Sequence, residues 1–409
     1  MVRQSLASAL LRRLDAFDAR RAAAYRAIGA ALTVLIVAAW FATARTGIDL
    51  SGKPLGTDFV SFWSAARLAI ADGAAAYDGA RHEALQQARF GAGHGYFAFF
   101  YPPAFLMLCA PLGLLPYLPA LAIWLGATGL GYAAVVRRWL GSNWRSTALT
   151  IAAFPPVLLN IGHGQNGFLT TALLGGGLLA MRSRPLVAGM LLGALVVKPH
   201  LAVLLPVALT LRGEWRTFLA TGAAASGWCL LSLALFGVEA WGAFLANADI
   251  ARATLEQGLV SPAKMVSLFA ALRVAGADLA TAYAAQAAGA TVAVLAVALA
   301  ARQRFARDGQ DAILIAATLG VSPFLLDYDL TLMALPLAWW LREALRRNFL
   351  DYEKAAMLAL FVAPLVLRPL AAAASLPLAP LVTIVLLWGC WRAAATASPC
   401  RHSHAASAR

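Results

Sequence analysis

The sequence predicts an all-α polytopic membrane protein, and three observations carry this prediction. The chain of 409 residues is 61% hydrophobic and only 13% charged, and its mean hydropathy is +0.72, unlike that of soluble globular domains. Apolar runs of about 17 to 25 residues, the length that crosses a bilayer as a helix, recur along the whole chain. The alternation of polar and apolar residues that a transmembrane barrel requires is not seen. Length and hydropathy together predict about 10 to 12 spans.

The net charge of +14 is explained best by membrane topology. The arginines are spread over short connecting segments and do not gather with aromatic residues in one patch, so nucleic acid is not expected as a partner. The basic segment 1–26 precedes the first apolar run, and the positive-inside rule predicts that it stays in the cytoplasm. No small-residue cleavage site follows that run, which favours an uncleaved first helix over a removed signal peptide.

Later basic segments set the orientation of the remaining helices. Four of them are expected in the cytoplasm, namely 182–184, 211–216, 302–308 and 341–348. The extracytoplasmic face then receives the loop 237–265 and four polar motifs, which are NIGHGQNG (160–167), VVKPH (196–200), SPFLLDYD (322–329) and RPLAAAAS (368–375). The segment 102–136 is long enough for two helices, although the charge pattern demands an odd number of crossings there. The sequence leaves that region open.

The segments group into one domain. We expect a single transmembrane domain over 27–396, in which 45–100 form a large extracytoplasmic loop. The last residues, 397–409, are expected to be a disordered cytoplasmic tail.

Two short helices are predicted within the extracytoplasmic loop. The first begins at about residue 58 and has the pattern of an amphipathic helix lying on a membrane face. Its apolar side comprises Phe59, Trp63, Ala66 and Ile70. The second is expected over 79–90.

Asp58 stands directly before the first of these helices and has two interpretations. The letters GTD before an apolar-periodic helix are an N-terminal capping signature, in which Thr57 or Asp58 accepts backbone N–H groups. A carboxylate at a helix N-terminus, beside an aromatic surface, is also well placed to take a proton from a bound hydroxyl. The two roles are compatible, and the loop sequence does not choose between them.

The motif 160–167 carries polar groups that suit sugar hydroxyls. A plain polar turn is its simplest alternative, since Asn and Gly form turns readily. The motif nevertheless holds more hydrogen-bonding side chains than a turn requires, namely Asn160, His163, Gln165 and Asn166. Tyr101 lies in FFYPPAF, whose two prolines indicate above all the start of a span with interfacial aromatics. We include all five residues in a predicted sugar or acceptor site.

Charged groups near helix ends supply the remaining candidates. Lys198 and His200 interrupt an otherwise apolar run beside a proline, which favours a phosphate-binding role over simple snorkelling of the lysine. Arg67 is a further candidate for the same phosphate. Asp327 and Asp329 form a DxD pair, a weak metal signal for which a helix-start role is an equally good explanation, and we add them to the sugar or acceptor site.

Other chemistry lacks its usual signals. The sequence contains no P-loop, GxGxxG, GxSxG or HExxH motif. Its four cysteines show neither CxxC nor paired spacing, so neither a disulfide framework nor a zinc site is indicated. No cofactor and no metal are predicted. His82 and Lys264 are weaker candidates, and each is expected to be a solvated loop residue.

The ordered motifs GTDFVSFWSAARLAIADGAAAYD, YPPAFLMLCAPLGLLP, GHGQNG, VVKPH and SPFLLDYDLTLMALPL resemble those of glycosyltransferase family 87, once called DUF2029, within the GT-C membrane glycosyltransferases. The resemblance covers about Gly56 to Pro336. Single motifs are weak, but five in the right order are fairly specific. The family includes mycobacterial mannosyltransferases that act on phosphatidylinositol mannosides, and its members take sugar from a polyprenyl-phosphate donor on the extracytoplasmic side.

This resemblance implies a GT-C-type fold and an essential acid in the first external loop, which matches Asp58. Gln165 and Asn166 stand where the family has its GQ.N motif, and Lys198 and His200 where it has its KP motif. The implied partners are a polyprenyl-phosphate sugar donor, a glycolipid or glycan acceptor and membrane lipids. The Ala- and Arg-rich style of the chain resembles proteobacterial proteins, which implies the cell inner membrane with the site facing the periplasm or cell exterior.

The implied activity is an inverting transfer of a hexose, with mannose as the first candidate. Asp58 would deprotonate the acceptor hydroxyl, and basic groups would stabilise the leaving phosphate. The competing class is a transporter or flippase of a lipid-linked sugar. Such a protein should show repeat-related broken helices and ionisable groups near mid-membrane, whereas the polar motifs here favour one face.

Overall fold

The computed structural model describes residues 12–14 and 17–397, and within those ranges it forms helices and no β-strand. The α-helices are α2 (Ala19–Thr43), α3 (Phe59–Ala69), α4 (Gly79–Phe90), α5 (Pro103–Gly113), α6 (Tyr117–Leu140), α7 (Trp144–Ala153), α8 (Pro155–His163), α9 (Gly167–Ala180), α10 (Pro185–Gly193), α11 (Leu205–Leu211), α12 (Trp215–Ala246), α13 (Ala248–Glu256), α14 (Leu268–Val274), α15 (Leu279–Arg302), α16 (Arg307–Val321), α17 (Ala334–Arg347), α18 (Glu353–Ala374) and α19 (Pro380–Ala397). Short 3₁₀-helices lie between them, namely η1 (Gly73–Tyr77), η2 (Ala194–Val197), η3 (Pro199–Leu201), η4 (Pro262–Lys264) and η5 (Asp327–Met333). The expected tail from residue 398 onward and most of the basic N-terminal segment lie outside the described residues.

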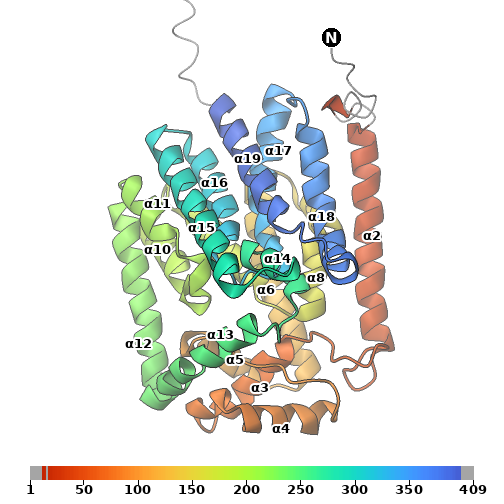
Figure 1. Ribbon diagram of the computed structural model, residues 1–409, viewed down its shortest axis with the longest axis vertical. Helices are drawn as coiled ribbons and strands as arrows, with labels where there is room; N and C mark the ends of the chain where they lie inside the picture. The colour runs from red at the N-terminus through yellow and green to blue at the C-terminus, as the bar shows by residue number, and fades with distance from the viewer. Residues whose placement is uncertain (1–11, 15–16, 398–409) are drawn as a thin grey trace, which may run out of the picture.

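Long apolar helices confirm the predicted class of all-α polytopic membrane protein. In the described part of the chain, six helices are long and apolar enough to cross a membrane, namely α2, α6, α12 with α13, α15, α18 and α19. Four shorter apolar stretches, of which 167–180 is one, stand among them. The long helices run side by side along the vertical axis of Figure 1. The expected 10 to 12 crossings stay a prediction, because the short stretches do not reach full spanning length.

The four basic segments expected in the cytoplasm meet at one end of the helix bundle. Ion pairs join each segment to another, and they are Arg182–Asp308, Arg307–Glu214, Arg212–Asp311 and Arg342–Asp308. Arg212 and Asp311 are both only 6% exposed and lie 2.6 Å apart, so this pair is part of the interior. The grouping that the charge pattern predicted is therefore real, since loops far apart in sequence contact one another at this end.

The loop 45–100 folds as a helical layer at the opposite end of the bundle. Figure 1 shows α3 and α4 across the lower end of the molecule, with α2 entering the bundle from the other end. The second expected helix is confirmed by α4, which covers Gly79–Phe90. The first expected helix is confirmed by α3, but the serines on its polar side do not face solvent. Its polar Ser61 and Ser64 are 3% and 0% exposed, so it is a core helix of this layer.

The open question about 102–136 has a simple answer. The segment contains one short helix, α5, and one full-length span, α6. An 11-residue helix is about 16 Å long, which is too short for a hydrocarbon core of about 30 Å. It packs instead against α3, so closely that a Cβ on Gly113 would lie 2.7 Å from the backbone of Ala66. One short helix and one crossing satisfy the odd number that the charges demand.

His82 holds α4 against α3 and is not the solvated residue that the sequence suggests. Its side chain is fully buried, Nε2 donates to the carbonyl of Ser61 at 3.2 Å, and Nδ1 accepts from the amide of Gln86 at 2.8 Å. The ring is therefore neutral. Burial lowers the pKa of His82 from 6.5 to about 4.

Stability should consequently depend on pH through His82. Because the pKa is depressed in the folded protein, the neutral ring stabilises the fold above about pH 6.5, and this contribution is lost as the pH falls toward 4. We expect His82→Ala to lower the thermal unfolding midpoint most at pH 7.5, with a gap to the parent that narrows by pH 4.5. Thermal unfolding in detergent measures this, with His94→Ala in the same layer as the control. A gap that does not change with pH would contradict the assignment.

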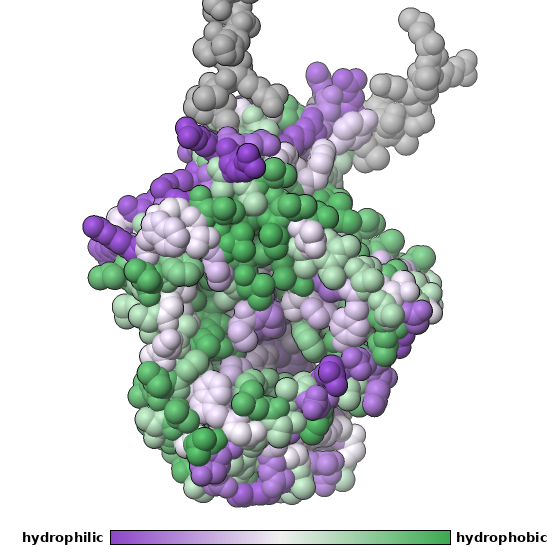
Figure 2. Space-filling model, turned by 60° about the vertical axis from the view of Figure 1, so that its left-hand side comes forward, coloured by the Kyte–Doolittle hydropathy of each residue, from purple (hydrophilic) through white to green (hydrophobic). Residues whose placement is uncertain are grey.

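The side of the molecule that bears α10 and α12 is largely apolar. Figure 2 turns this side toward the viewer and shows hydrophobic residues over much of it, with a recess near the middle in which hydrophilic residues are visible. Exposed apolar side chains on α12, including Leu230 at 65% and Leu235 at 61%, are those expected of a lipid-facing surface.

Candidate active site

Asp58 is placed by contacts between the helical layer of residues 45–100 and the turn after α8. The backbone N–H of Asp58 donates to the carbonyl of His163 at 2.9 Å. Gly164 permits this approach, because its φ is +63° and a Cβ there would lie 2.6 Å from the Cβ of Phe59. The side chain of Asp58 makes no capping hydrogen bond to α3, so the capping interpretation is wrong. The carboxylate is free to face the turn.

Three polar side chains surround the carboxylate of Asp58. Gln165 donates from Nε2 to Oδ2 at 3.1 Å, and the hydroxyl of Thr57 lies 3.5 Å from Oδ1. Nδ1 of His163 lies 3.7 Å from Oδ1 and 3.0 Å from the Thr57 hydroxyl. The side chain of Asp58 remains 23% exposed. It is therefore both held in place and reachable by a ligand.

The pKa of Asp58 is lower than its ordinary value of 3.8. Burial by itself raises the pKa, but the neighbouring imidazole of His163, the hydrogen bond from Gln165 and the charge of Lys264 outweigh it. Asp58 is thus ionised at neutral pH. An ionised carboxylate that is partly exposed can accept a proton from a bound hydroxyl.

Gln165 can only be oriented one way. Its Oε1 accepts from the backbone N–H of Asn166 at 3.0 Å and from the hydroxyl of Tyr101 at 3.1 Å. A backbone N–H cannot accept, so this side of the amide must be the oxygen, and the NH₂ group faces Asp58. Tyr101, expected in the site from its motif, therefore reaches Asp58 through Gln165.

We expect Gln165→Leu to lower the rate of sugar transfer by about 10-fold, because one hydrogen bond to an ionised group is worth about 1.5 kcal/mol or more. Tyr101→Phe should have a smaller effect, since it removes only the outer bond of the chain. Steady-state transfer kinetics measure both. If Tyr101→Phe were the more damaging change, Tyr101 would have to contact substrate directly.

Lys198 lies in a second part of the cluster and is already paired. Its Nζ is 2.5 Å from Oδ1 of Asp329 and 3.2 Å from Oδ1 of Asn166, and it stands over the ring of Tyr328. Both members of the ion pair are buried, with Lys198 4% and Asp329 0% exposed. This pair ties the VVKPH motif to the start of η5.

Asp327 and His163 both contact Arg368, which was not among the site residues predicted from the sequence. Nη1 of Arg368 lies 3.4 Å from Oδ2 of Asp327 and 3.4 Å from Nε2 of His163. Because a guanidinium can only donate, Nε2 of His163 is the acceptor and the ring proton is on Nδ1, beside Thr57. The signal for Arg368 was present in the sequence. A charge inside an apolar helix, next to a proline, marks function by default.

Several predicted residues carry buried polar atoms for which the described residues supply no hydrogen-bond partner. They are Nδ2 of Asn160, Nδ2 of Asn166, Nε2 of His200 and Oδ1 of Asp327. Buried polar groups are nearly always paired, so a concentration of unpaired ones suits a site that a polar ligand completes. The packing around Gly167 keeps them together, since a Cβ there would lie within 2.7 Å of Asn160 and Thr331.

Arg67 is the predicted residue that the structure does not bring to this cluster. Its guanidinium donates to the carbonyl of Gly113 at 3.1 Å and stacks over Trp63. Nine residues of helix separate it from Asp58, about 13 Å along α3. Within 12–14 and 17–397, no three His, Cys, Asp or Glu side chains are grouped as metal ligands are.

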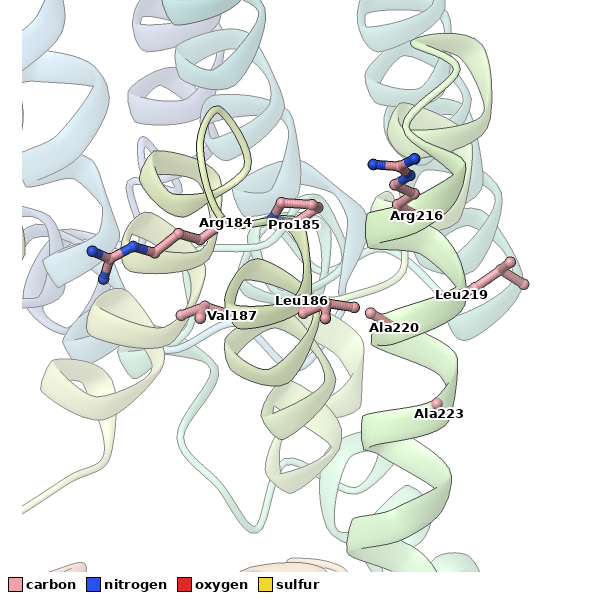
Figure 3. A pocket seen from close by; sticks show the side chains of 8 residues that line it. All are labelled: Arg184, Pro185, Leu186, Val187, Arg216, Leu219, Ala220 and Ala223. Carbon is pink, nitrogen blue, oxygen red and sulfur yellow. The ribbon is translucent and has the colours of Figure 1, made fainter.

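A separate hollow lies between α10 and α12, with a volume of about 800 Å³. Figure 3 shows Leu186 of α10 directed toward Ala220 of α12, with Arg184 and Arg216 near its upper end. The lining is apolar apart from these two arginines, which belong to the basic end of the bundle. It contains no carboxylate or amide that could act on a sugar, so the Asp58 cluster is the candidate active site.

Comparison with known proteins identifies the family of this chain. The sequence model of glycosyltransferase family 87 matches residues 99–336, more than half of the chain, and this range includes Gln165, Lys198 and Asp329. No curated protein and no solved structure matches the chain. The chain therefore belongs to glycosyltransferase family 87, and it is a multi-pass membrane glycosyltransferase.

Proposed function

We propose that the protein is an inverting hexosyltransferase of the inner membrane. It moves a hexose, with mannose as the first candidate, from a polyprenyl-phosphate donor to a hydroxyl of a lipid-linked or glycan acceptor. The reaction takes place at the extracytoplasmic face with Asp58 as general base. The observation that carries this proposal is the hydrogen bond from Gln165, inside the family match, to Asp58, which lies outside it.

The proposed chemistry needs one base. Asp58 accepts the proton of the acceptor hydroxyl while the acceptor oxygen bonds to the anomeric carbon and the bond from that carbon to the phosphate oxygen breaks. Attack from the face opposite the phosphate inverts a β-linked sugar to an α-glycoside. The leaving polyprenyl phosphate is already an anion of low basicity, so no general acid is required.

The surroundings of Asp58 support this role. Gln165 and Thr57 leave part of the carboxylate exposed, and the low pKa keeps it ionised. Asn160 and Asn166 offer unpaired amide donors for sugar hydroxyls. Asp58 stands at the start of α3, in the layer that lies at the end of the bundle opposite the basic segments (Figure 1), which supports an extracytoplasmic site.

Lys198 has a different part in this proposal from the one that its motif suggests. Asp329 already neutralises its charge, and its ammonium is almost fully buried. We assign it the positioning of Asn166 and η5. His200, whose Nε2 is unpaired, stays a candidate for contact with the donor.

A transfer assay in liposomes tests the function against the flippase alternative. Purified protein is given a radiolabelled polyprenyl-phosphate hexose and a membrane extract as the source of acceptor. Labelled glycolipid or glycan that depends on Asp58 is the expected product. Movement of intact donor across the bilayer without any new product would support the flippase and overturn the proposal.

A further inference from the structure

We propose that Arg368, assisted by Lys264, binds the phosphate group of the lipid-linked donor. This inference rests on the proposed function and names the part of the site that takes the leaving group. Arg368 lies outside the residues that the family model matches.

Three carboxylates and three cationic side chains lie in the described part of the site, and one carboxylate and one cation already form an ion pair. Lys198 and Asp329 are buried and 2.5 Å apart, so neither is available to an anion. The carboxylates that remain are Asp58 and Asp327, and the cations that remain are Arg368 and Lys264. The charge of Lys264 acts on both of these acids, and the structure shows no ion pair for its ammonium within the described residues.

Arg368 is only loosely engaged. Its two contacts, with Asp327 and His163, are both 3.4 Å long, whereas charge-assisted N–H···O bonds are typically about 2.7 to 2.9 Å. Both contacts use Nη1, and no partner is seen for Nη2 or Nε in the structure as described. The side chain is 38% exposed. A guanidinium with two free nitrogens is suited to hold two oxygens of one phosphate.

The position of Arg368 fits a lipid phosphate. It lies in the membrane-spanning helix α18, and Leu365 and Val366 on the preceding turn are 49% and 43% exposed, as lipid-facing residues are. The helix also contacts η4, which carries Lys264, and α8, which carries His163. A phosphate at the head of a polyprenyl chain can therefore meet both cations while its tail stays in the bilayer.

The geometry also matches the order of the reaction. The imidazole of His163 lies between Asp58, 3.7 Å from Nδ1, and Arg368, 3.4 Å from Nε2. Base and cation are thus separated by the width of one imidazole ring. As the bond to the anomeric carbon breaks, the phosphate gains negative charge, so Arg368 stabilises the transition state more than the bound donor.

Binding measurements with defined lipids test this assignment. A short-chain polyprenyl monophosphate is titrated into detergent-solubilised protein, with the matching polyprenol as the uncharged control. Arg368→Gln should weaken binding of the phosphate by about 10- to 100-fold, the range for one hydrogen-bonded charge, and leave binding of the polyprenol unchanged. Arg368→Lys should fall between the parent and Arg368→Gln. Arg252→Gln, an exposed arginine on α13, is the matched control and should bind like the parent.

A second variant and a second lipid show whether a loss of binding is specific to the donor phosphate. Lys264→Gln lies in a short surface turn and should weaken phosphate binding without loss of thermal stability, even if Arg368→Gln folds poorly. An equal loss of affinity for phosphatidylglycerol would show a general attraction to anionic lipid and would overturn the assignment. So would normal phosphate binding by both variants. The proposed function fails on a different outcome, namely a parent protein that binds the phosphate no better than the polyprenol.

Discussion

Replacing Asp58 by asparagine should lower the rate of sugar transfer by about 10²- to 10⁴-fold, the usual effect of losing a general base. Asparagine keeps the shape of the side chain and an oxygen that can accept from Gln165. It cannot take a proton from the acceptor hydroxyl. Because Asp58 makes no capping bond to α3, the variant should also unfold at nearly the same temperature as the parent. Initial rates with a radiolabelled donor, together with thermal unfolding, measure both effects.

The helical layer of residues 45–100 offers a matched control for this experiment. Asp72 lies in the same layer, caps η1 through Ala74 and pairs with Arg81 at the surface. Asp72→Asn removes the same charge, and transfer should stay within about two-fold of the parent because a surface ion pair is worth little. A normal rate of sugar transfer by Asp58→Asn would contradict the assignment of Asp58 as general base. Equal losses in both variants would indicate a general need for negative charge in the layer.

The buried pair of Lys198 and Asp329 carries the second large effect, which is on stability. Lys198→Met should destabilise the protein by about 3 to 5 kcal/mol, since it leaves the carboxylate of Asp329 buried without its partner. The double variant Lys198→Met/Asp329→Leu should recover much of this loss, because an apolar pair can replace a buried ion pair at little cost. Thermal unfolding midpoints in detergent compare the three proteins.

An exposed pair provides the control. Arg252 and Asp249 on α13 are 64% and 86% exposed, and Arg252→Met should cost no more than about 1 kcal/mol. If the double variant were less stable than Lys198→Met, the two residues would not act as a pair. The double variant should nonetheless transfer sugar slowly, because Asn166 loses the contact that positions it.

The local sequence around Asp58 and its contacts in the fold indicate different roles for its carboxylate. The motif GTD before an apolar helix supports capping on local grounds, and that interpretation is wrong. The carboxylate is engaged instead by Gln165, which is 107 residues away in sequence. Its role as a base stays a proposal that the loop sequence allows and the family resemblance favours, and the contacts around Asp58 explain its low pKa.

The burial of the α3 serines and of His82 does not follow from the sequence, for a related reason. Residues at helical spacing identify an apolar face, but they do not reveal what covers the other faces. Here α4 and α5 enclose α3, so its serines are buried and His82 becomes part of the interface. The serines on the polar side of α3 are thus buried inside the layer that residues 45–100 form.

The sequence by itself determined the membrane class, the end of the bundle at which the basic segments gather and the set of polar motifs that share the other end. Hydropathy and charge act locally, residue by residue, against a bilayer, and so they can be read without knowing the fold. Only the tertiary structure decided that Lys198 is neutralised by Asp329, 131 residues away, and that Arg368 reaches His163 across 205 residues. Such pairings depend on how the helices pack, because the charge available to a ligand is what remains after each side chain has met its neighbours.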